Sequence, residues 1–411
     1  MPLFSPATLG PLELRNRVIK AATYEGMSPG GVATEDLVTF HRRLAEGGVG
    51  LTTVAYCAVS DEGRTFPDQL RLNAPSRDRL SVLTRAVHDA GGRASLQIGH
   101  AGMFSKVRGV GGRAPRGPSL AFNAYGISAG LPWARAMSDA DIDAVVDDFG
   151  RAAETAAGLG FDAVEVHLGH GYLLSQFLSP AINRRRDRYG GSLDNRLRFP
   201  LAVLERVRAA VGTGVAVIAK TNLDDGFPGG LGIDEAVQIA VALEESGAVD
   251  LLIPSGGNTA RSPFYLLRGG LPLKEMAAAQ TDPLAAVAMR VLGRAIVRPH
   301  VFSEAFFLSL AERVRSEVKM PIGLLGGLVS RDNLVQARER GFDFVVLGRA
   351  LIADPELVNR MARGDIDRTR CDACNLCVAE MDLGGVRCVL DGPRSAPPGS
   401  SEGVPSGASW R

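Results

Sequence analysis

The chain has 411 residues, 45% of them hydrophobic and 22% charged, which suits a globular protein with one large barrel and an appendage or with two ordinary domains. Its net charge of +1 gives no reason to expect nucleic acid or an anionic membrane surface as a partner. No apolar run approaches membrane-spanning length, and the N-terminus lacks the basic-then-apolar layout of a signal peptide. We therefore expect a cytoplasmic protein with no membrane partner.

Apolar strand patterns alternate with amphipathic helix patterns along most of the chain. The predicted strands span residues 17–23, 50–58, 94–98, 163–167, 215–220, 251–254, 322–326 and 344–347. The predicted helices span residues 34–46, 77–90, 140–158, 195–211, 233–246, 304–318, 332–340 and 355–363. Eight strand-then-helix units predict an α/β fold of the closed (β/α)8 TIM barrel type, with a doubly wound open sheet as the alternative.

The barrel is predicted to occupy residues 1–365, followed by a four-cysteine extension at 366–390 and, from its composition, a disordered tail at 391–411. Within the barrel, a Gly-Gly turn at residues 190–191 leads into Ser192, a predicted helix N-cap. The segment from about 256 to 300, after the sixth strand, is predicted to be a long apolar loop. Such a loop fits a substrate lid, a pocket wall or a contact between copies in a homo-oligomer.

In a TIM barrel the functional residues lie just beyond the carboxyl ends of the strands. His167, His170 and Tyr172 follow the fourth predicted strand, and Tyr24 follows the first, where it would face the same site. Two imidazoles and a phenol are poor core material, because each carries a polar atom that needs a partner. They can hold a polar ligand and pass it a proton. A metal site or structural histidines are the competing interpretations of the histidine pair.

Phosphate sites on such barrels are formed by the loops after the seventh and eighth strands. Gly326 and Gly327 follow the seventh predicted strand, and Gly348 and Arg349 follow the eighth. Glycines offer backbone N–H groups without a Cβ in the way, and a guanidinium can bind a phosphate through two hydrogen bonds. The two pairs together predict a phosphate site at this end of the barrel.

The run HLGHGYLLSQFLSPAINRRRDRYGGSLDNRLRF, at residues 167–199, closely resembles the signature of the old yellow enzyme and 2,4-dienoyl-CoA reductase flavoproteins. The segments NRVIKAAT, LQIGHAG, GLVSRDN and VLGRALIADP resemble other strand ends of the same family. The resemblance implies FMN as the cofactor. Lys220 stands where many members have arginine, which keeps the positive charge but loses the planar fork. Carried over by position, the residues in contact with the flavin are Ala22, Thr23, Gln97, Lys220, Gly327, Gly348 and Arg349.

The resemblance further implies an NAD(P)H-oxidising reductase of small activated alkenes, namely enones, enals or enoyl thioesters. The nicotinamide would visit the flavin only transiently, since no separate dinucleotide fingerprint is visible. His167 and His170 would stabilise the negative charge that develops on the substrate carbonyl oxygen, and Tyr172 would protonate the α-carbon. Three alternatives stay open: an oxidative amine or N-methyl dehydrogenase, a flavin-free phosphate-binding lyase or isomerase, and a non-enzymatic redox sensor.

The cysteines gather near the end of the chain. Cys371, Cys374, Cys377 and Cys388 have the spacing C-x2-C-x2-C-x10-C, which allows four thiolates to converge on one metal centre. The fragment resembles the [4Fe–4S] segment of 2,4-dienoyl-CoA reductases and trimethylamine dehydrogenases, so we rank an iron–sulfur cluster ahead of four-cysteine zinc. A cluster would call for an external electron-transfer partner. Cys57, within an apolar strand, is predicted to be a core residue.

Overall fold

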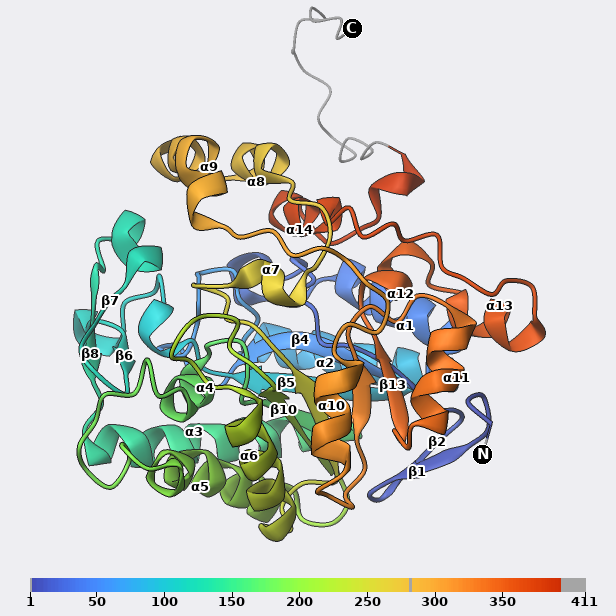
Figure 1. Cartoon of the computed structure of the whole chain (residues 1–411), viewed down its shortest axis with the longest axis horizontal. Helices are drawn as coiled ribbons and strands as arrows, with labels where there is room; N and C mark the ends of the chain where they lie inside the picture. Colours follow the sequence, from blue (N-terminus) through green and yellow to red (C-terminus); the bar gives the residue numbers. More distant parts are fainter. Residues whose placement is uncertain (1, 281–282, 393–411) are drawn as a thin grey trace, which may run out of the picture.

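The computed structural model describes residues 2–280 and 283–392, and its central feature is a closed barrel of eight parallel strands (Figure 1). The hydrogen-bonded order is β11-β10-β9-β5-β4-β3-β13-β12, and a parallel bridge between Leu252 and Ile322 joins the two ends. The TIM barrel prediction is therefore confirmed and the open sheet is excluded. In chain order the strands are β3 (Val18–Lys20), β4 (Leu51–Ala58), β5 (Arg93–Gly99), β9 (Ala163–His167), β10 (Ala216–Asn222), β11 (Leu251–Ser255), β12 (Gly323–Leu325) and β13 (Phe344–Leu347).

Helices cover the outside of the barrel, close to where the sequence pattern predicted them (Figure 1). They are α1 (Glu35–Glu46), α2 (Ala74–Asp89), α3 (Asp139–Gly158), α5 (Leu193–Val211), α6 (Ile233–Glu245), α10 (Leu308–Arg315), α11 (Arg331–Glu339) and α13 (Leu357–Arg363). Ser192 caps α5 by accepting a hydrogen bond from the backbone N–H of Asn195, as predicted. Helix α10 begins four residues later than predicted, because Ala305 adopts a left-handed conformation with φ of 48°.

The segment after β11 is not the irregular loop that the sequence pattern predicted. It forms α7 (Pro263–Leu266), α8 (Leu273–Ala279) and α9 (Pro283–Ile296). Helices α8 and α9 lie together with α14 (Leu376–Glu380) at the top of Figure 1, beyond the end of the barrel. The prediction failed because these helices pack on each other and not on the sheet, so they fall outside the strand-then-helix alternation.

Several short elements complete the described chain. A hairpin of β1 (Ala7–Leu9) and β2 (Leu12–Leu14) precedes the barrel, and β6 (Arg116–Gly117), β7 (Ala121–Phe122) and β8 (Trp133–Ala136) form a small separate sheet. Helices α4 (Leu173–Leu178) and α12 (Arg349–Ala353) follow β9 and β13. The predicted disordered tail lies outside the described residues, except that Asp391 ends a 3-10 turn at Val389–Asp391.

Barrel strands are buried on both faces, because side chains fill the interior and helices cover the exterior. Strands β4, β9 and β10 are buried along their whole length. Cys57 lies in β4 with no exposed surface, which confirms that it is a core residue, and burial raises the pKa of its thiol. In residues 2–280 and 283–392, none of the helices has the length and apolar character needed to cross a bilayer.

Candidate active site

Two histidines and a serine form a hydrogen-bonded row at the carboxyl ends of β9 and β11. His167 is the last residue of β9, and His170 follows in a left-handed conformation with φ of 57°. His167 Nε2 lies 3.0 Å from His170 Nδ1, and His170 Nε2 lies 2.7 Å from Oγ of Ser255 at the end of β11. Asn222 Oδ1 accepts the backbone N–H of His170 at 3.0 Å and so holds this turn. The structure thus brings the two predicted histidines together.

Tyr172 packs on the ring of His167 within an aromatic cluster. The two ring centroids are 4.2 Å apart and the ring planes are inclined by 31°. Tyr56 and Phe104 contact Tyr172 edge-on, with centroid distances of 5.2 and 5.1 Å. The Tyr56 hydroxyl in turn donates to Thr65 Oγ1 at 3.2 Å. Two predicted site residues from the end of β3 pack on the margin of this cluster: Ala22 and Tyr24.

Burial sets the protonation of these groups. Burial and, secondarily, the nearby charge of Lys220 lower the pKa of His170 to about 3. The pKa of His167 is lowered well below its usual range, mainly by burial. Burial and the neighbouring Tyr56 raise the pKa of Tyr172 well above its ordinary value. At neutral pH each imidazole therefore carries one proton and the phenol keeps its own, so the site offers neutral hydrogen-bond donors.

Glu165 on β9 and Lys220 on β10 form a buried ion pair inside the barrel. Lys220 Nζ is 2.7 Å from Glu165 Oε1, and Gln97 Nε2 donates to the same oxygen at 2.6 Å. Lys220 and Glu165 are at most 1% exposed. Glu165 therefore joins Gln97 on β5 to Lys220 on β10, two residues that the family resemblance places against the flavin. The other carboxylate oxygen, Oε2, has no hydrogen-bond partner among the described residues.

The ends of β12 and β13 carry the predicted phosphate glycines. Gly327 has φ of 72°, and a Cβ there would lie 2.7 Å from the backbone oxygen of Ser303, so the position requires glycine. Gly348 follows β13 beside Thr23, whose Cγ2 would lie 3.5 Å from a Cβ at residue 348. Thr23 Oγ1 is buried without a hydrogen-bond partner in the described part of the chain. The site thus holds a polar atom that a bound group could satisfy.

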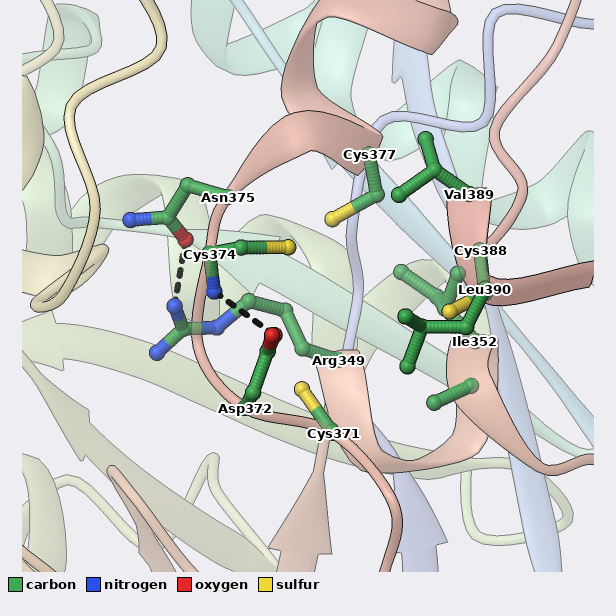
Figure 2. Close-up of a pocket in the computed structure, with 11 residues that line it drawn as sticks. Arg349, Ile352, Cys371, Asp372, Cys374, Asn375, Cys377, Cys388, Val389 and Leu390 are labelled. Carbon is green, nitrogen blue, oxygen red and sulfur yellow. Dashed lines mark hydrogen bonds between the residues drawn. The ribbon is translucent and has the colours of Figure 1, made fainter. Parts of the chain in front are cut away.

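The four clustered cysteines line one pocket beside α12, and Figure 2 shows their sulfur atoms facing a shared space. All of them are free thiols. Burial raises the pKa of Cys377 to about 12, so this thiol stays protonated at neutral pH unless something else binds it. Within residues 2–280 and 283–392, no three His, Cys, Asp or Glu side chains are gathered closely enough to hold a single metal ion. A metal centre here stays a prediction.

Arg349 and Asn375 tie the cysteine segment to the segment after β11. The Arg349 guanidinium donates to the backbone oxygen of Arg268 at 2.9 Å and to Asn375 Oδ1 (Figure 2). Asn375 Nδ2 donates to the backbone oxygen of Gly270 at 2.8 Å. The guanidinium that the sequence assigned to a phosphate is therefore used in this tie, and its contact with a phosphate stays a prediction.

The arrangement fits a flavin, since the buried cation Lys220, the buried unsatisfied hydroxyl of Thr23 and the obligatory glycine Gly327 lie at the carboxyl ends of β10, β3 and β12. The model of the NADH:flavin oxidoreductase / NADH oxidase family matches residues 2–255. The chain belongs to this family. It is accordingly an FMN-dependent NAD(P)H oxidoreductase, which confirms the family resemblance and excludes the flavin-free lyase.

The chain is similar to three further proteins of known sequence or structure. The chain is 42% identical over 388 residues to the 4,4'-dithiodibutanoate disulfide reductase of Rhodococcus erythropolis, covering 94% of each chain. It is 25% identical, with a TM-score of 0.78, to the 6-hydroxypseudooxynicotine amine oxidase of Pseudomonas geniculata, of which it spans 53%. The old yellow enzyme homologue of Zymomonas mobilis has the same fold at 23% identity, with a TM-score of 0.68 and 95% of that chain covered.

Two site residues, Glu165 and Tyr56, were not singled out from the sequence, and the contact of Ser255 with His170 was not foreseen. Glu165 lies in the apolar strand AVEVH, and a charged residue in a strand buried on both faces is a signal that could have been used. Ser255 ends β11 and Tyr56 lies near the end of β4. Their roles depend on contacts between strands distant in sequence, and no local pattern reveals such contacts.

Proposed function

We propose that this family member reduces a C=C bond conjugated to a carbonyl group, as in an enone, enal or enoyl thioester. The observation that carries the proposal is the neutral, buried histidine pair at the end of β9, with a protonated tyrosine packed against it. FMN, when bound, accepts a hydride from NAD(P)H and delivers it to the second substrate. Residues of the chain must then handle the charge and the proton.

The side chains of the site divide this work. The histidine pair donates a hydrogen bond to the substrate carbonyl oxygen, on which negative charge develops when hydride reaches the β-carbon. Tyr172 holds the proton that the α-carbon takes, and its raised pKa keeps that proton in place until it is needed. Tyr24 borders the same aromatic cluster and would limit the width of the pocket. The alkene thereby gains one hydride and one proton.

A second candidate is the reduction of a disulfide, in which two electrons and two protons convert one disulfide into two thiols. It is favoured by the 42% identity, over 94% of both chains, to a disulfide reductase. In that reaction the same neutral donors would protonate the departing thiolate. The substrate would then be an organic disulfide such as 4,4'-dithiodibutanoate.

One anaerobic experiment separates the candidates. The bound flavin is reduced with NADPH or NADH until its visible band bleaches, and 2-cyclohexenone or 4,4'-dithiodibutanoate is then added. Return of the band with the enone supports alkene reduction, and return with the disulfide alone favours the second candidate. Bleaching by an amine in the absence of nicotinamide would instead indicate an amine dehydrogenase. Return with neither oxidant would refute both proposals.

We further propose that Cys371, Cys374, Cys377 and Cys388 hold a [4Fe–4S] cluster. The support is that the four thiols line one pocket and have the spacing C-x2-C-x2-C-x10-C. When bound, such a cluster would carry single electrons toward an external partner. Iron and acid-labile sulfide near four per chain, with a matching electron paramagnetic resonance signal after reduction, would support the cluster. One zinc per chain without sulfide would refute it.

A further inference from the structure

Asn222, at the end of β10, uses every hydrogen-bonding atom of its buried amide. Its Oδ1 accepts the backbone N–H of His170 at 3.0 Å, and its Nδ2 donates at 2.8 Å to the backbone oxygen of Gly257 and at 2.8 Å to Asp225 Oδ1. A backbone N–H can only donate and a backbone carbonyl can only accept, so these partners fix which end of the amide is oxygen. The direction of each bond is therefore unambiguous.

Asp225 is the buried acid behind this amide, and it is 1% exposed. Its Oδ1 accepts from Asn222, and its Oδ2 accepts the backbone N–H of Leu231 at 2.9 Å and the hydroxyl of Ser179 at 2.6 Å. Each oxygen thus faces at least one group that can only donate, the amide NH2 on one side and a backbone N–H on the other. An asparagine at position 225 would have to turn its own NH2 group toward one of these donors.

The backbone of His170 needs a hold from outside its own turn. Its φ of 57° lies in the left-handed region, which costs a residue with a Cβ about as much as one hydrogen bond contributes. Asn222 accepts its N–H, and the backbone N–H of Thr259, beyond β11, donates to its carbonyl oxygen at 2.9 Å. In this conformation the imidazole contacts both His167 and Ser255.

We propose that Asp225 and Asn222 are positioning residues for His170. Asp225 accepts the second hydrogen of the Asn222 amide and keeps the amide in place, and the amide oxygen keeps His170 in its left-handed turn. Without Asp225, the bond to Gly257 would still fix the sense of the amide, but a buried N–H would lack an acceptor, which favours any arrangement in which the amide turns away. The role toward the substrate rests on the proposed carbonyl function, whereas the hold on His170 depends only on these hydrogen bonds.

The hold can be measured from the solvent exchange of the His170 backbone amide in flavin-loaded protein labelled with 15N-histidine. The sequence has six histidines, and the signal missing from a His170→Gln variant identifies this amide. In Asp225→Asn we expect the His170 amide to exchange about tenfold faster, the effect of losing roughly one hydrogen bond. Adding Asn222→Asp reverses donor and acceptor within the pair and should bring the exchange rate back toward that of the wild type. A double variant that exchanges as fast as Asp225→Asn would refute the pairing.

Asn183 offers a matched control, because its buried amide makes the same kinds of bond without touching the residues that hold His170. Its Nδ2 donates to two backbone oxygens and its Oδ1 accepts one backbone N–H, and these belong to Phe177, Tyr189 and Arg185. Asn183→Ala and Asn222→Ala should both lower the urea midpoint, but only Asn222→Ala should accelerate exchange of the His170 amide. Equal acceleration in the two variants would indicate general destabilisation and refute a positioning role.

Binding of a para-substituted phenol measures the consequence for the substrate, because the phenol oxygen accepts hydrogen bonds as a carbonyl oxygen does. Its dissociation constant, obtained from the change in the flavin spectrum, should rise about tenfold in Asp225→Asn and fall again when Asn222→Asp is added. Faster exchange of the His170 amide with an unchanged dissociation constant would refute the role toward the substrate.

The two measurements separate this inference from the proposed function. Unchanged exchange of the His170 amide in both Asp225→Asn and Asn222→Ala would overturn the inference, even in a protein that reduces enones. The expected exchange pattern in a protein that reduces no enone would refute the proposed function and leave the hold on His170 intact.

Discussion

Replacing Lys220 by methionine should destabilise the barrel, because it leaves Glu165 charged and buried with one partner fewer. The two groups are 2.7 Å apart and at most 1% exposed. Removing one partner of such a pair costs about 3–5 kcal/mol. Glu165 keeps its hydrogen bond from Gln97, so we expect the lower end, about 3 kcal/mol. The same change should weaken FMN binding, because the cation expected beside the flavin is lost.

The double variant Lys220→Met with Glu165→Met tests this account. It removes both charges and leaves only Gln97 with an unmade hydrogen bond, which costs about 1 kcal/mol. The double variant should therefore be more stable than Lys220→Met alone by about 2 kcal/mol. Urea unfolding followed by circular dichroism, with and without added FMN, measures both quantities. A double variant no more stable than the single one would refute the view that the buried unpaired carboxylate causes the loss.

Three further outcomes follow from the site and its surroundings. Tyr172→Phe keeps the aromatic ring that packs on His167 but removes the hydroxyl. In stopped-flow measurements it should slow flavin reoxidation by an enone about 10²–10⁴-fold and leave flavin reduction by NAD(P)H unchanged. Equal slowing of both steps would contradict a proton-donor role. Because the pKa of His170 falls to about 3 on folding, the unfolded chain binds more protons than the folded chain between pH 6.5 and pH 3. The urea midpoint should therefore fall as the pH drops through this range. His170→Asn should make the urea midpoint depend less steeply on pH. Gly269 has φ of 127°, and a Cβ there would lie 2.1 Å from the backbone oxygen of Ala373. Gly269→Ala should therefore make the cysteine segment more sensitive to cleavage by trypsin. Gly158→Ala, where a Cβ would have nothing within 4 Å, should leave the cleavage rate unchanged.

The sequence was sufficient for the barrel, since each strand reads as an apolar run and the covering helices have a helical periodicity of apolar residues. It also indicated that His167, His170 and Tyr172 lie together, because polar groups directly after a buried strand are conspicuous, and their roles stay predictions. Helices α8 and α9 were missed, since they pack against each other in a segment that does not alternate with strands.

Other features could not be predicted, because they depend on distances between residues far apart in the chain. Ser255 and His170 are 85 positions apart, and Glu165 and Gln97 are 68 apart. The direction of a long side chain is a further example. Arg349 follows β13 as predicted, yet its guanidinium bonds to Arg268 and Asn375, a choice that depends on where the later segment folds back.

The tie between the cysteine segment and the segment after β11 makes their stabilities interdependent. Gly270 N donates to Ala373 O at 2.9 Å beside the bonds from Asn375, so neither segment can move away without breaking the other's hydrogen bonds. By thermodynamic linkage, any ligand that prefers the folded cysteine segment adds its binding free energy to the cost of opening the neighbouring segment. Oxidation of the thiols, metal binding to them or removal of such a metal would then change the hydrogen-exchange rates of residues 263–279, which are distant in sequence from the cysteines.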